Sequence, residues 1–170
     1  MFRATVFLPL WFLAPLGLWA QFPRIFPRGV ANAASYMAPG LPGGAIARGS
    51  AFSVFGTDLG PVSSPTLAFP LSTTLGGLSI KVTAPNGGPS ADAIPIFVGP
   101  GQINAIMPSN APLGMVSMQV MFNTARSNPS PVRVVNSSFG AFAANGAGAG
   151  PGSMFNFVSA GVQPINSTRN

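Results

Sequence analysis

Side chains that carry out acid–base chemistry are almost absent from this sequence. It has no His, no Cys and no Glu, and its only carboxylates are Asp58 and Asp92. General acid–base catalysis normally uses His or paired carboxylates. Here one Asp lies in a turn-forming stretch and the other lies beside the start of an expected strand. Turn formation and solvation are the simpler roles, so we predict no catalytic residues.

Lys81 is the only lysine, so a Ser–Lys dyad would depend on it. A catalytic lysine is normally desolvated, whereas Lys81 falls on the polar side of an alternating segment. A calcium site normally needs six to eight oxygen ligands, several of them carboxylates, and Asp58 with backbone carbonyls would make only a weak one. We therefore predict a protein that is not an enzyme and that has no metal site and no cofactor.

Two amide side chains flank a tight Gly-Pro-Gly turn at residues 99–101 and are candidates for an interaction surface. Gln102 and Asn104 would satisfy backbone groups around this turn in a purely structural role. In the alternative role, the same amides would bind a carbohydrate beside Tyr36 or a Phe. The sequence leaves both roles open.

Three methionines, Met115, Met118 and Met121, are spaced as they would be on one face of a helix. In a strand they divide between two faces, with Met118 in the core and Met115 and Met121 outside. The outer pair would extend an exposed apolar patch of the kind that marks an interface. Ordinary packing is the alternative for both.

The composition is apolar and nearly uncharged. Hydrophobic residues make up 47% of the 170 residues and charged residues only 6%, against about 25% charged residues in an average globular protein. The eight Lys and Arg residues are scattered, whereas a nucleic-acid interface needs clustered basic side chains, so we predict no nucleic-acid binding. So little charge to keep copies apart favours a place in a larger assembly or a cell-surface polymer.

Residues 1–20 are typical of a secretory signal peptide. A basic start precedes an almost wholly apolar run, and Ala20 supplies a small residue before Gln21. The apolar run is short for a membrane span, which needs about 20 residues; an uncleaved N-terminal anchor is the alternative. Export without Cys is typical of a bacterial protein. We predict a secreted or cell-surface location, with no membrane span after cleavage.

Short alternating segments bounded by Gly and Pro fill most of the remaining chain. In the clearest one, Leu78, Ile80 and Val82 would face the core. No segment after the signal shows helical spacing, so we predict an all-β fold, an immunoglobulin-like β-sandwich of about six to eight short antiparallel strands over residues 46–142. Strands are expected at 50–56, 77–83, 93–98 (with Ile94, Ile96 and Val98 alternating), 102–107, 113–123 and 132–135.

Two segments flank this predicted sandwich. Residues 21–45 are rich in Pro, Gly and Ala and are predicted to be an extended lead-in. Residues 143–170 are predicted to be a Gly-rich tail, with one further strand over 153–158. The tail would also contain the start of a truncated second half.

Four short motifs follow one another over residues 29–142: Asn-Ala-Ala-Ser at 32–35, Phe-Gly-Thr-Asp-Leu at 55–59, Leu-Gly-Gly at 75–77 and Pro-Gly-Gln-Ile-Asn at 100–104. In order and spacing they resemble the uncharacterised C-terminal domain family abundant in Solibacter and other Acidobacteria. The first half also looks like immunoglobulin-like IPT/TIG modules. The resemblance implies a secreted domain, often part of a multidomain protein, with no activity to carry over. The family pattern continues into a second β-rich half, so this chain would match the first half only.

These observations together predict a secreted, non-enzymatic β-sandwich module for extracellular or cell-surface protein interaction or structural assembly. A protein partner or a second copy would bind to an uncharged face, or would add a strand along an exposed edge at 114–122 or 153–158. The alternatives are an accessory carbohydrate-binding module of a secreted degradative system and an inactive fragment of a longer secreted protein.

Overall fold

The computed structural model describes residues 22–145 and 152–153. The predicted signal peptide, most of the Gly-rich tail and nearly all of the strand expected over 153–158 lie outside these residues. The described residues contain no helix with the length and hydrophobicity that a membrane crossing requires. They form the strands β1 (Arg24–Asn32), β2 (Ile46–Ala47), β3 (Ala51–Thr57), β4 (Thr74–Leu75), β5 (Leu78–Thr83), β6 (Ser90–Val98), β7 (Gln102–Ile106), β8 (Gly114–Phe122), β9 (Ala125–Arg126) and β10 (Ser130–Val135), and the 3-10 turn η1 (Pro85–Gly87).

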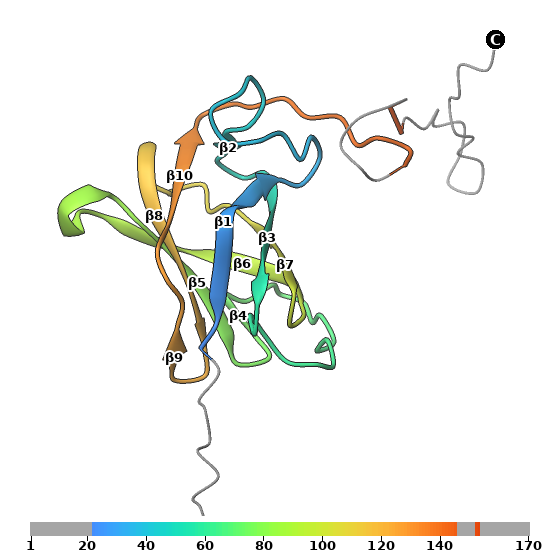
Figure 1. Cartoon of the computed structure of the whole chain (residues 1–170), viewed down its shortest axis with the longest axis vertical. Helices are drawn as coiled ribbons and strands as arrows, with labels where there is room; N and C mark the ends of the chain where they lie inside the picture. Colours follow the sequence, from blue (N-terminus) through green and yellow to red (C-terminus); the bar gives the residue numbers. More distant parts are fainter. Residues whose placement is uncertain (1–21, 146–151, 154–170) are drawn as a thin grey trace, which may run out of the picture.

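The predicted all-β fold is confirmed, but the strands form one continuous sheet rather than a clear sandwich. Their order is β1-β3-β7-β6-β5-β8-β10-β2, with β4 added to β5 and β9 added to β8. The sheet curls until it is nearly closed into a barrel, with β1 and β10 running side by side in Figure 1. It is mixed rather than antiparallel throughout, because β2 pairs with β10 in parallel.

Strand β6 is the reason that two separate sheets do not form. Its first part, Ser90–Ala93, pairs with β5, and its second part, Ile94–Val98, pairs with β7. Within the second part, a register shift lies between Pro95 and Phe97, and it changes which side chains of β6 face the core. Such a bulge is expected beside proline, which cannot donate a ladder hydrogen bond. As a result Val98 is buried, whereas Ile94 and Ile96 are only half-buried.

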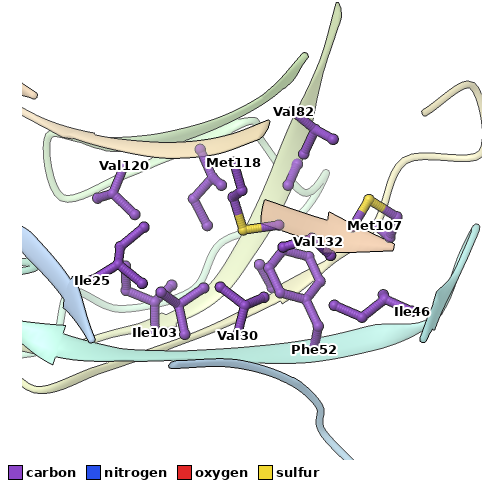
Figure 2. Close-up of a cluster of buried hydrophobic side chains, with 14 of the residues drawn as sticks. Ile25, Val30, Ile46, Phe52, Val82, Ile103, Met107, Met118, Val120 and Val132 are labelled. Carbon is purple, nitrogen blue, oxygen red and sulfur yellow. The ribbon is translucent and has the colours of Figure 1, made fainter. Parts of the chain in front are cut away.

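Elsewhere alternation predicts the core correctly. Leu78, Ile80 and Val82 of β5 are fully buried, and Lys81 between them is exposed. Figure 2 shows Phe52 and Ile103, from β3 and β7, facing Met118 and Val120 of β8 across the interior. The core therefore lies between the β1-β3-β7 side of the barrel and the β5-β8-β10 side, and side chains from both sides fill it.

Residues 24–32 form strand β1 rather than a lead-in that precedes the sheet. The strand pairs with β3 at Arg24–Ile25 and again at Val30–Asn32, and it bulges in between. Pro27 lacks a backbone N–H, and Arg28 has a φ of 59°; neither fits a regular ladder. This interruption hides the strand from pattern reasoning, although Ile25 and Val30 on either side of it are buried.

Strand β8 is an interior strand, so the predicted free edge over Gly114–Phe122 is wrong. It pairs with β5 along one side and with β10 along the other. The ends of the sheet are β1 and the two-residue strand β2. The alternating pattern of β8 indicates which face is buried, but it contains no information on which strands pair with β8.

The side chain of Asn128 makes a bridge to β1, which is one end strand of the sheet. Its Oδ1 atom accepts a hydrogen bond from the Ile25 N–H at 2.8 Å, and its Nδ2 group donates one to the Ile25 carbonyl oxygen at 3.1 Å. One primary amide thus makes the pair of bonds that a neighbouring strand would make. This bridge joins β1 to the segment that leads into β10.

We expect Asn128→Ala to lower the free energy of unfolding by about 1–3 kcal/mol, because it leaves the N–H and carbonyl of Ile25 without their partners. Asn128→Asp keeps the acceptor and loses the donor, so it should cost less. Urea unfolding followed by circular dichroism measures both. The control is Asn110→Ala, in an exposed loop position; a loss equal to that of Asn128→Ala would show that the bridge contributes nothing.

Candidate interaction surface

Two of the four sequence motifs meet at one end of the barrel. The N–H of Gly56 donates to the carbonyl oxygen of Gly101 at 3.1 Å, and the N–H of Leu59 donates to that of Pro100 at 2.9 Å. Leu59 is fully buried, which anchors the segment that follows β3. The Phe-Gly-Thr-Asp-Leu motif therefore holds the Gly-Pro-Gly turn in place and fixes the residues on both sides of it.

A third motif positions Tyr36. The Oδ1 atom of Asn32, only 3% exposed, accepts hydrogen bonds from the N–H groups of Ala34 at 2.9 Å and Ser35 at 3.3 Å. This side-chain turn ends β1 and directs the chain across β3. The Tyr36 ring then packs on the Phe55 ring, with centroids 6.0 Å apart and planes at 45°.

The outer side of β3, β7 and β6 carries the candidate surface, which we call the aromatic face. The register sets Phe55 opposite Gln102, and it sets Asn104 between Ser53 on one side and Phe97 on the other. Directly opposed residues of antiparallel strands share a face, so these side chains adjoin. The aromatic face consists of Tyr36, Phe55, Phe97, Gln102 and Asn104, together with Ser53, which has no exposed surface, and none of these residues is charged.

A small polar network lies between the aromatic rings. The Oδ1 atom of Asn104 accepts hydrogen bonds from the Ser53 hydroxyl and from Nε2 of Gln102, each at 2.9 Å. The backbone partners predicted for the two amides are wrong, because these hydrogen bonds are made to side chains. Within the described residues, Nδ2 of Asn104 and Oε1 of Gln102 make no hydrogen bond, which leaves an NH2 donor group and a carbonyl acceptor available.

The two outer methionines lie elsewhere. Met115 is 54% exposed and Met121 is half-buried, whereas Met118 is fully buried, as predicted. Six strand positions separate Met115 from Met121, or about 20 Å at 3.4 Å per residue, so the two do not form a single patch. Met121 lies opposite Ser79, and Met115 lies opposite Arg133. The structure thus brings Tyr36, Gln102 and Asn104 together and leaves both methionines apart from them.

The residues considered for catalysis and metal binding occupy ordinary positions. Lys81 Nζ lies 3.3 Å from Asp92 Oδ1, with about half of each side chain exposed, and such solvated pairs contribute little to stability. Asp58 has a φ of 54° at the end of β3 and makes no side-chain hydrogen bond within the described residues; backbone bonds close its turn instead. No three His, Cys, Asp or Glu side chains of the described part come together as a metal site.

Sequence reasoning did not single out Ser53, Phe55 or Phe97. The two phenylalanines alternate with the buried Val54 and Val98, and this phase could have marked them as outward-facing aromatic residues. The pairing of Ser53 with Asn104 depends on the register of β3 and β7, which no local pattern contains.

No family model matches the chain, and no curated protein is significantly similar to it. The resemblance of the four motifs to the Acidobacteria family therefore stays a prediction. Three of the motifs nevertheless have structural roles in holding a turn or placing a ring, and the fourth forms the β4–β5 turn, where Gly76 and Gly77 have φ values of 57° and 79°.

Proposed function

We propose that this chain is a non-enzymatic β-module that binds a protein partner through the aromatic face, as part of an extracellular or cell-surface assembly. The observation that carries the proposal is the set of aromatic rings around a fixed polar network on a face without charge. Tyr36 is 36% exposed and Phe97 is 41% exposed. Interface cores are enriched in aromatic residues and depleted of charge in the same way. The location rests on the predicted signal peptide.

The face supports this proposal better than the strand edges do. Strand addition requires a free edge with regular backbone groups. Strand β2 has only two residues, and β1 is interrupted by its bulge and bridged by Asn128. Neither end of the sheet offers a long regular ladder of backbone groups. A partner would therefore make more favourable contacts with the aromatic face than with a strand edge.

The polar network favours binding without rearrangement. Asn104 is already held by Ser53 and Gln102, so little side-chain freedom is lost when a partner arrives. The available Nδ2 donor of Asn104 and Oε1 acceptor of Gln102 complement a peptide group, which presents one acceptor and one donor. The rings beside them supply the apolar contact.

Site-specific photo-crosslinking tests the proposal in the cells that produce the protein. The photoreactive p-benzoylphenylalanine is placed at Phe97 or, as a control of similar exposure (45%), at Leu113. We expect a discrete protein adduct from Phe97 that is absent from Leu113. Adding Tyr36→Ala should weaken this adduct about tenfold, since aromatic anchors dominate interface energies. No adduct, or the same adducts from both positions, would contradict the proposal.

A carbohydrate ligand is the second candidate. The observation that favours it is the Tyr36–Phe55 ring pair next to unsatisfied amide groups, which suit sugar rings and hydroxyls. In the crosslinking experiment this candidate predicts an adduct at Phe97 that glycosidases remove and proteases do not. The nature of the adduct therefore decides between the two candidates.

A further inference from the structure

A pocket of about 430 Å³ lies between β1, β10 and the loop that joins β1 to β2. It occupies the part of the barrel where β1 runs beside β10 in Figure 1. Its volume is in the range of small-molecule sites, and it shares no residue with the aromatic face. Its lining includes Arg28, Leu41, Met115, Ser130, Pro131 and Arg133.

The pocket walls are held by internal hydrogen bonds. The Leu41 N–H donates to the Ala38 carbonyl oxygen at 3.2 Å, and the Gly44 N–H donates to the Leu41 carbonyl oxygen at 2.9 Å, which forms two successive turns. The opposite wall is the β1 bulge, in which Arg28 has a φ of 59°. Both walls therefore result from defined backbone conformations, and Asn128 ties β1 to the segment before β10.

Two arginines give the pocket an uncompensated positive charge. Arg28 and Arg133 are exposed, and within the described residues neither side chain makes a hydrogen bond or an ion pair. No acidic residue lines the pocket. Asp92 is paired with Lys81, and Asp58 lies at the end of β3. An anion that enters the pocket would meet two guanidinium groups and no repelling carboxylate.

Ser130 is a second and independent indication of a ligand. It is only 5% exposed, it lines the pocket, and its hydroxyl makes no hydrogen bond to the described residues. Among the described residues no buried side-chain nitrogen or oxygen lacks a hydrogen-bond partner, so the Ser130 oxygen is open to solvent and can reach a molecule in the pocket. Leu41 and Met115, each 54% exposed, supply apolar surface on the same pocket together with Pro131.

We propose that this pocket binds a small organic carboxylate with an apolar body. The carboxylate lies between Arg28 and Arg133, because a planar guanidinium group matches a carboxylate through two parallel hydrogen bonds. The Ser130 hydroxyl donates to the same group, and the apolar body packs on Leu41 and Met115. This binding is independent of the partner proposed for the aromatic face.

Isothermal titration of the full secreted chain tests the chemistry of the ligand. The probes are 4-phenylbutyrate, the alcohol 4-phenylbutanol, which has the same body without charge, and acetate, which has the charge without the body. We expect 4-phenylbutyrate to bind about tenfold or more tightly than either comparator. Its affinity should also fall as NaCl rises from about 50 to about 500 mM, because salt screens the arginines.

Charge-matched variants test the position of the site. Arg28→Gln and Arg133→Gln should each weaken 4-phenylbutyrate binding about tenfold, whereas Arg126→Gln on β9, outside the pocket, should change it less than about twofold. Equal losses at all three arginines would overturn the site. No binding of 4-phenylbutyrate below about 5 mM, or equal binding of 4-phenylbutanol, would overturn the proposal even if a variant failed to fold.

Discussion

Replacing Gly56 with alanine will lower the free energy of unfolding by about 3 kcal/mol, at the upper end of the usual cost of overpacking. A Cβ atom at this buried position would overlap the backbone oxygen of Arg24 and would come within 2.9 Å of Cδ2 of Leu59. Gly56 is opposite Ile25 in the β1–β3 ladder. The Arg24 oxygen can move away only if β1 separates from β3, so relieving the overlap would break hydrogen bonds between these two strands.

Gly101 provides the matched control, because it lies directly across the hydrogen bond from Gly56. A Cβ atom at Gly101 would have its nearest contact at 3.9 Å, which is ordinary packing. Gly101→Ala should therefore be neutral or slightly stabilising, through the smaller entropy of its unfolded chain. Urea unfolding of the two variants measures the difference. Equal stabilities would mean that close backbone approach does not explain the glycine at position 56.

Phe52→Ala will cost about 3–5 kcal/mol, the usual loss for a large aromatic side chain removed from a core. Phe52 has no exposed surface, and Figure 2 shows its ring in the interior, between Val30 and Ile46. Its loss leaves a cavity that a continuous sheet cannot easily collapse to fill. With typical domain stabilities of about 5–15 kcal/mol, this single change removes a large part of the total.

Two variants separate this effect from the mere loss of a phenyl ring. Phe52→Leu keeps most of the volume and should cost clearly less than Phe52→Ala. Phe97→Ala removes the same ring from a position that is 41% exposed and should cost about 1 kcal/mol or less. Chemical denaturation at a fixed temperature measures all three. A loss for Phe97→Ala as large as that for Phe52→Ala would contradict the assigned core.

The sequence predicts individual strands well and their assembly poorly. The faces of β3, β5 and β8 follow from period-two alternation, because burial of one face is a local property of the chain. Closure of the sheet depends on β6 pairing with β5 and β7 in succession and on Asn128 reaching Ile25 across 103 positions. Neither interaction leaves a local pattern, and the Pro27–Arg28 bulge conceals β1.

The candidate surface was predictable only in part, for a similar reason. Gln102 and Asn104 could be found because they flank an obvious turn. Phe97 adjoins Asn104 only through the register of β6 and β7. The basic pocket depends even more on assembly, since its arginines come from β1 and β10, which are far apart in the strand order. Residues near a turn can be recognised from sequence, whereas those that meet through pairing cannot.

The bridge from Asn128 to Ile25 also constrains the order in which the chain can fold during its synthesis. The first strand is made early, but the amide that completes its hydrogen bonding lies 103 residues later. Contacts of such large sequence separation form slowly, because the chain loses the entropy of closing the loop before the contact contributes any favourable energy. An emerging chain that lacks residue 128 therefore has an open barrel with β1 unsupported on one side. Closure of the barrel therefore waits until almost all of its strands have been made.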